Sequence, residues 1–157
     1  MTKYNIKEKS EHIAAYRTCI SPAVMDDLQA RILDILLIKK MYKNKDYSAK
    51  QLAQDLGTNS RYVSAVVNVK FHMNYTSLVN KYRIEEAMSL LVDKRYRNLN
   101  MEDISEMVGF ANRQSFYSAF YRLQGCTPRD YKMRYIRNHP DKAPARGRKT
   151  TKPASDK

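Results

Sequence analysis

The sequence predicts an all-α protein, and three observations lead to that prediction. No stretch alternates apolar and polar residues with the period of two that indicates a half-buried strand. Apolar residues recur at helical spacing instead, as Phe116, Ala119, Phe120 and Leu123 do. Asn or Ser precedes most of these segments and Gly follows several, and these residue types favour helix starts and stops. Hydrophobic residues make up 43% of the 157 residues, enough to build a packed interior.

The first long helix is expected from Pro22 to about Tyr42, after an N-terminal extension over residues 1–21. Ser21 suits the N-cap, and Pro22 suits the first helical position. The apolar residues of this helix form a core face and a wider margin: Leu28, Ile32, Ile35 and Leu36 on the face, and Leu33, Leu37 and Ile38 on the margin. Packing against a neighbouring helix is the expected use of this stripe, and self-association through residues 25–42 is the alternative.

Two later segments, about 48–70 and 100–123, each pair a short helix with a second helix across a glycine. Each has an N-cap, a terminating glycine and a second N-cap, which are Ser48, Gly57 and Asn59 in the first and Asn100, Gly109 and Asn112 in the second. Ser48 with Gln51 forms a capping-box pattern, and Asn100 and Asp103 open the short helix of the second segment. The second helices are expected over about 60–69 and from Asn112 to near Gly125.

These two segments are copies of one pattern. Aligning SAKQLAQDLG with NMEDISEMVG places Ser48 on Asn100 and Gly57 on Gly109. A short capped helix, a turn and a second capped helix form a helix-turn-helix. The sequence therefore predicts two helix-turn-helix subdomains. A long linker helix over about 75–93 joins them, and a last helix over 128–138 follows.

The charge of the chain indicates a polyanionic partner. Lys and Arg number 29 against 16 Asp and Glu, which gives a net charge of +13. Nucleic acid is the commonest polyanion that such proteins bind, and an anionic membrane surface is the weaker alternative. The sequence has no apolar run long enough to span a bilayer and no signal-peptide pattern. We therefore expect a soluble cytoplasmic protein associated with the nucleoid and not with a membrane.

The sequence gives no sign of an enzyme, a cofactor or a metal site. Its three histidines are scattered, and Cys19 and Cys126 have no metal-ligand spacing. A Gly-rich phosphate loop and a Ser/His/Asp set are also absent. Cys126 is interpreted as a buried loop cysteine, with a redox-sensing thiol as the alternative.

From about Lys45 to Tyr135 the sequence closely resembles the AraC/XylS family of bacterial transcription regulators. The resemblance is carried by YSAKQLAQDLGTNSRYVS, YRIEEAMSLL, MEDISEMVGF and FYSAFYRLQGCTPRDY. It implies a homeodomain-like DNA-binding domain over residues 22–138, in which the second helix of each unit enters the major groove. His72, Ala65 and Ser118 depart from the family pattern, the first where a loop glycine is common and the other two where Arg is frequent. Too few residues precede the first unit for a ligand-sensing domain, so a small-molecule effector is not expected.

The candidate DNA contacts lie at the N-terminus and on the outer face of each recognition helix. They are Asn59, Ser60, Arg61, Ser64, Ala65 and Asn68 in the first unit, and Asn112, Arg113, Gln114, Tyr117, Ser118, Tyr121 and Arg122 in the second. The second face has no acid. Arg can pair with guanine and Gln with adenine, whereas Tyr and Ser more often bind phosphate. Asn59 and Asn112 are expected to act mainly as caps, with phosphate contact as the alternative. Val63, Val66 and Val67 are expected to face inward.

The linker helix sets the distance between the two recognition helices. About nineteen residues at about 1.5 Å per residue span roughly 28 Å. One turn of B-DNA is about 34 Å, so bending of the DNA is expected if both helices bind one face. Arg83, on the linker helix, is interpreted as structural and as a partner of Asp103 or Glu102.

Residues 139–157 are expected to form a disordered basic tail, because they contain little that could be buried. Arg146, Arg148 and Lys149 are interpreted as a nonspecific DNA anchor, with a minor-groove AT-hook as the alternative. The chain is thus predicted to be a sequence-specific transcription regulator that binds double-stranded DNA. An architectural DNA-binding protein of low sequence specificity is the alternative. RNA polymerase is a candidate partner, and a monomer or a weak dimer is expected.

Overall fold

The computed structural model describes residues 19–142, and that part of the chain is helical without a strand. The α-helices are α2 (Pro22–Leu33), α3 (Ala49–Asp55), α4 (Ser60–Phe71), α5 (Tyr75–Val92), α6 (Met101–Met107), α7 (Arg113–Gln124) and α8 (Pro128–Asn138). Short turns of other helix types are η1 (Asp34–Ile38), η2 (Met41–Lys43), η3 (Lys94–Tyr96) and η4 (Pro140–Lys142). The all-α prediction is confirmed. Residues 1–18 and the proposed anchor at Arg146, Arg148 and Lys149 lie outside the described residues.

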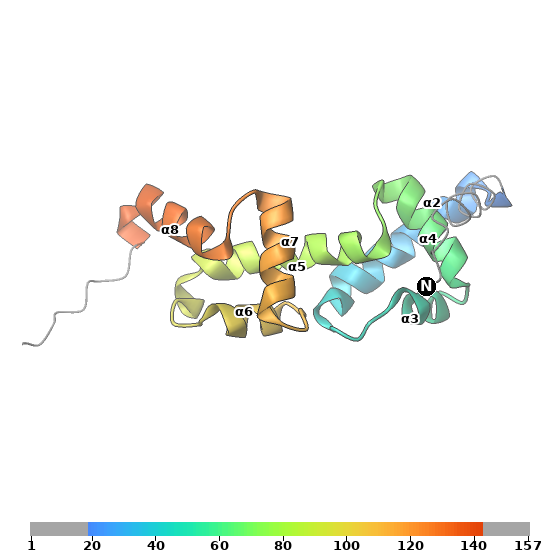
Figure 1. Cartoon of the computed structure of the whole chain (residues 1–157). Helices are drawn as coiled ribbons and strands as arrows, with labels where there is room; N and C mark the ends of the chain where they lie inside the picture. The colour runs from blue at the N-terminus through green and yellow to red at the C-terminus, as the bar shows by residue number, and fades with distance from the viewer. Residues whose placement is uncertain (1–18, 143–157) are drawn as a thin grey trace, which may run out of the picture.

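The described helices form two units that share α5. Figure 1 shows α2, α3 and α4 gathered around one half of α5, and α6, α7 and α8 around the other half. Each unit has its own cluster of buried apolar side chains. The first cluster ends at Val79 and the second begins at Ile84, so the division falls inside α5. This is the expected arrangement of two helix-turn-helix subdomains, α3–α4 and α6–α7, on one linker helix.

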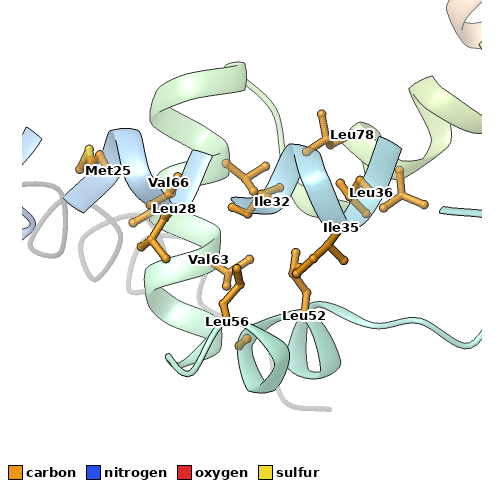
Figure 2. Packing of buried hydrophobic residues seen from close by; sticks show 14 of the residues in the cluster. Met25, Leu28, Ile32, Ile35, Leu36, Leu52, Leu56, Val63, Val66 and Leu78 are labelled. Carbon is orange, nitrogen blue, oxygen red and sulfur yellow. The ribbon is translucent and has the colours of Figure 1, made fainter. Parts of the chain in front are cut away.

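The first core is built from the residues whose periodicity predicted it. Ile32, Leu36 and Leu52 are fully buried, and Val63, Val66 and Val67 of α4 are buried with them. Figure 2 shows Leu52 of α3 and Leu56, directly after α3, lying toward Ile35 and Val63. Burying a Leu, Ile or Val side chain stabilises a fold by about 1.5–3 kcal/mol, so this packing holds α4 firmly in place.

The first long helix is shorter and less regular than predicted. α2 ends at Leu33, and the chain continues as a π-helical turn in which Lys39 N–H donates to Asp34 O. Lys40 then adopts a left-handed conformation with φ 53°, which ends the helix before Tyr42. A π-helical turn rotates the following residues around the axis. Ile38 is therefore 76% exposed, and it does not widen the core stripe as expected.

The predicted helix caps are confirmed, with one difference. Asn100 Oδ1 accepts from Asp103 N–H, and the Asp103 carboxylate accepts from Asn100 N–H, which completes a capping box. Ser48 Oγ accepts from Gln51 N–H at 3.2 Å. The Gln51 side chain donates to Asp55 instead of returning to Ser48, so only half of the predicted box forms there.

Candidate nucleic-acid interface

The N-terminus of α4 carries the outward-facing groups of the first unit. Asn59 caps this helix, because its Oδ1 accepts from the backbone N–H of Arg61 and of Tyr62, each at 3.0 Å. Ser60 and Arg61 are exposed directly after the cap. Ser64 and Asn68, further along the helix, are half-buried. Arg61 is thus the one long cationic side chain among the predicted contacts of this unit.

Ala65 was predicted to face outward, and that prediction is wrong. Its side chain is 0% exposed and belongs to the first buried cluster. α2, α3 and α5 all pack against α4, which leaves the helix a narrower free face than periodicity predicts. A methyl group is also short enough to be shielded by neighbours one turn away. Ala65 is therefore a packing residue in this fold.

α7 presents a broader polar face in the second unit. Arg113, Gln114, Ser118, Tyr121 and Arg122 are exposed, and Tyr117 is half-buried. Phe116, Ala119 and Phe120 are buried on the opposite face, as predicted. Leu123 was expected to join them, but it is 44% exposed and does not belong to the second cluster.

Arg113 and Tyr117 form a pair on this face. The guanidinium carbon of Arg113 lies 5.0 Å from the centroid of the Tyr117 ring, and Arg113 Nη2 lies 3.4 Å from the Tyr117 hydroxyl. The Tyr117 ring packs edge-on against the buried Phe116, with 5.9 Å between the centroids. Tyr117 therefore serves as a support that orients the guanidinium, through a cation–π contact, before any ligand binds.

The turn between α6 and α7 is fixed by two hydrogen bonds. Asn112 Oδ1 accepts from Ser115 N–H at 2.8 Å, which caps α7 as predicted. Ser105 is almost fully buried in α6, and its hydroxyl donates to the backbone carbonyl of Asn112 at 3.2 Å. No local pattern in the sequence indicated this contact, because it joins residues on either side of the turn.

Arg83 does not pair with Asp103 or Glu102, contrary to expectation. Asp103 is held in the capping box with Asn100. Arg83 Nε donates to Tyr42 O at 2.6 Å, and its Nη2 donates to Asn44 O at 3.1 Å. Tyr42 lies in η2 and Asn44 directly after it, at the start of the loop that leads to α3. Arg83 is structural, as predicted, but it binds the backbone of the first unit and not an acid of the second.

The second helix-turn-helix approaches the end of η2 closely. Gly109 has φ +97°, and a Cβ there would lie 2.7 Å from the carbonyl carbon of Lys43. Lys43 also forms an ion pair with Glu86 of α5 at 2.8 Å, and Glu86 accepts a hydrogen bond from the Tyr42 hydroxyl at 3.1 Å. The Lys43 hydrogen bond holds the pKa of Glu86 below its ordinary value. Burial, with the nearby Glu86 charge, raises the pKa of Tyr42 to about 12.

These contacts define a seam between the two units, made of Tyr42, Lys43, Asn44, Arg83, Glu86 and Gly109. α5, with 18 residues, spans about 27 Å at about 1.5 Å per residue. Because the seam and α5 both join the units, α4 and α7 are held at a set separation and orientation.

The family-level comparison agrees with this geometry. A helix-turn-helix domain family of AraC type matches residues 52–134, which is more than half of the chain. The chain belongs to the AraC-type helix-turn-helix family. This family consists of DNA-binding transcription regulator domains and is not an enzyme family.

Relatives of this AraC-type domain come from several bacteria. It is 28% identical over 83 residues to the uncharacterized HTH-type transcriptional regulator YtdP of Bacillus subtilis. That match covers 53% of the chain but 10% of YtdP. The C-terminal domain of the two-component response regulator yesN from Fusobacterium nucleatum has a TM-score of 0.58 at 25% identity, over 66% of this chain and 98% of that one.

A second solved structure shows the same fold. The C-terminal domain of AraT, a response regulator from Geobacillus stearothermophilus, has a TM-score of 0.58 at 24% identity. The similarity covers 73% of this chain and 86% of that domain.

The described part of this AraC-type domain has neither a membrane span nor a metal-type cluster. Between residues 19 and 142, no helix is long and apolar enough to cross a bilayer. No group of three or more His, Cys, Asp or Glu within that range could hold a metal ion.

Proposed function

We propose that this AraC-type domain is a sequence-specific transcription regulator that inserts α4 and α7 into successive major-groove segments of double-stranded DNA. One observation carries the proposal. Each recognition helix begins at an Asn cap with an exposed arginine in its first turn, and both helices are held on α5 at a set separation. A net charge of +13 adds the attraction to phosphate that such binding requires.

The two helices contribute unequally in this proposal. α7 supplies Arg113 and Gln114 for base edges, with Ser118, Tyr121 and Arg122 beside the phosphates. α4 supplies Arg61 for a base and Ser60 for the backbone, since Ala65 is buried and Ser64 and Asn68 are half-buried. The caps Asn59 and Asn112 hold the two N-termini in place.

DNA bending is part of the proposal. The span of α5, about 27 Å, is shorter than the turn of about 34 Å that separates successive major-groove segments. The seam leaves little freedom to lengthen that span. Gel mobility that depends on the position of the site within the fragment would support bending, and constant mobility would contradict it.

Selection of bound duplexes from a random library, at near-physiological salt, tests the function. Two conserved blocks of DNA sequence about one helical turn apart would support base recognition by both α4 and α7. Arg113→Ala should erase preference in one block and Arg61→Ala in the other. Arg129→Ala, on the exposed face of α8, is the matched control and should change neither block. Tight binding without any enriched sequence would contradict sequence-specific regulation.

A second candidate is an architectural DNA-binding protein of low sequence specificity. The narrow free face of α4 favours it, because Arg61 is the one exposed long side chain among that helix's predicted contacts. The ratio of specific to nonspecific affinity separates the two functions, since it is large for a regulator and small for an architectural protein.

The proposed function also implies a cellular location and partners. A regulator of this kind acts on the nucleoid in the cytoplasm, as a monomer or a weak dimer, with RNA polymerase as a candidate contact. Sedimentation with and without a selected duplex measures the oligomeric state.

A further inference from the structure

A basic cavity of about 410 Å³ lies beside the recognition helix of the first unit. Besides Tyr47 and Tyr75, its polar lining, here called the basic groove, has the six residues Lys45, Ser48, Ser64, Thr76, Asn80 and Arg83. These residues come from the loop before α3, from α3's cap, from the flank of α4 and from α5. The lining contains two cations and several hydroxyl groups but no carboxylate. A cavity of this composition is suited to an anion.

The charge of Arg83 is uncompensated in this groove. Its three hydrogen-bond acceptors are Tyr42 O, Asn44 O and Asn80 Oδ1, and all three are neutral. Lys45 is exposed and has no side-chain hydrogen bond within residues 19–142, and the same holds for the Thr76 hydroxyl. A half-buried cation with only neutral partners, next to a free ammonium group, is stabilised when an anion enters.

A neighbouring cavity differs from the basic groove in the charge of its lining. It lies across the same loop and measures about 480 Å³, and its charged lining consists of Asp46, Glu102 and Glu106 with Lys43 and Lys45. The three carboxylates outnumber the two lysines there, which disfavours a phosphate in that cavity. Lys45 borders both cavities, so the anion is directed to the side where acids are absent.

The basic groove also has the right position relative to α4. Ser64 lines it, and Arg61 lies one turn earlier on the same side of α4, because residues three apart are neighbours on a helix. A helix in the major groove is bordered by a phosphate backbone. In homeodomains the loop between the first and second helices contacts that backbone. The loop with Lys45 holds the same place in the first unit here.

We propose that the basic groove seats one backbone phosphate of the DNA strand that borders α4, with Lys45 as its mobile cation and Arg83 as its fixed one. This inference rests on the proposed function. It adds a sequence-independent grip at the first unit, where the free face of α4 offers few contacts of its own. Arg83 thereby joins the seam to the DNA backbone, because the guanidinium that binds the loop also faces the phosphate.

The test compares Lys45→Ala, Lys45→Arg and Lys81→Ala in the full chain. Lys81 is an exposed lysine on α5 that lines neither cavity, so it gives the same charge loss elsewhere. Affinity for two unrelated duplexes is measured across a range of salt concentrations. Lys45→Ala should lower the slope of log affinity against log salt by about 0.9 on both duplexes, as expected for one lost phosphate contact. Lys45→Arg should restore the slope, and Lys81→Ala should leave it near the wild-type value.

A second measurement places the phosphate itself. Single neutral methylphosphonates are introduced along a selected duplex, one position at a time. One position should weaken wild-type binding about tenfold or more, as expected for losing a hydrogen bond to a charged group. The same substitution should have little further effect on Lys45→Ala. Thermal unfolding of each variant confirms that the fold is retained.

Distinct outcomes overturn the two proposals. Equal salt slopes for Lys45→Ala and Lys81→Ala, with tight wild-type binding, would refute the basic groove and leave the proposed function standing. Absence of wild-type binding to any duplex would refute the proposed function. Stabilisation by inorganic phosphate that is lost in Lys45→Ala, with equal DNA slopes, would assign the groove to a free anion and overturn the DNA contact.

Discussion

The guanidinium of Arg83 lies over the ring of Phe110, with 5.5 Å between the guanidinium carbon and the ring centroid. Phe110 follows the glycine of the second helix-turn-helix turn, and Arg83 also donates to the backbone of the first unit. One side chain of α5 therefore contacts both units. Arg83 therefore links the unit that carries α4 to the unit that carries α7.

Arg83→Ala should loosen the seam. It removes hydrogen bonds to Tyr42 O and Asn44 O and a cation–π contact, a loss of about 2–3 kcal/mol of unfolding free energy. Chemical denaturation monitored by circular dichroism gives this value. Lys81→Ala, at an exposed position two residues earlier, should change the stability by less than about 0.5 kcal/mol. A wild-type midpoint for Arg83→Ala would show that the contacts of Arg83 contribute nothing to stability.

Gly109→Ala should be much more destabilising than Gly57→Ala. Both glycines have positive φ, which costs another residue about 1–2 kcal/mol. At Gly57 a Cβ would meet nothing within 4 Å, whereas at Gly109 it would collide with the backbone of Lys43. The collision adds about 1–3 kcal/mol, because backbone atoms cannot move aside cheaply. Equal melting temperatures for the two variants would contradict the close approach of the turn to the loop.

The Lys43–Glu86 pair should make stability depend on acid pH. The pKa of Glu86 lies below its ordinary value of 4.5 because Lys43 hydrogen-bonds to it. A lowered folded-state pKa contributes stability above about pH 4.5 that is lost as the pH falls through the folded pKa. The wild type should therefore exceed Glu86→Gln by about 1 kcal/mol at neutral pH. Denaturation of both proteins from neutral to acid pH should show the difference in unfolding free energy shrinking as the pH falls. A stability difference that does not depend on pH would rule out the Lys43–Glu86 pair as its cause.

Ala65→Arg and Ser118→Arg should separate buried from exposed positions on the recognition helices. Ala65 is fully buried, so an arginine there must displace packed side chains at a cost of about 2 kcal/mol or more. Ser118 is exposed, so an arginine there should leave stability within about 0.5 kcal/mol of the wild type. Urea denaturation measures both. Equal stability of the two variants would mean that position 65 is open to solvent.

Local signals account for what the sequence predicted well. Ser48, Asn59, Asn100 and Asn112 are caps, and cap residues act on backbone groups two or three positions away. Such short-range chemistry can be read directly from sequence. The same reasoning located the buried valines of α4, because their spacing repeats with the helical period.

The missed features depend on residues far apart in the chain. Arg83 was assigned to an acid because charge was the only visible clue, and the carbonyls it binds lie about forty residues earlier. Ala65 was placed outward by periodicity alone, which cannot show that three helices pack around α4. The early end of the first helix follows from a left-handed Lys40, a conformation for which lysine gives no local signal. The basic groove was not predicted for the same reason, since its six polar residues are spread over four segments of the chain.

The division of the buried clusters within α5 has a consequence for how the molecule opens. The first cluster ends at Val79 and the second begins at Ile84, so a single helix serves as a wall for both. If one of the two units unfolds, α5 loses its packing partners along that half of the helix, but the other unit still packs against the rest of it. Amide hydrogens near the middle of α5 should therefore exchange with solvent only when both halves are open together, which makes them the slowest in the described chain. α5, which sets the distance between the two recognition helices, is therefore also the last described helix to unfold.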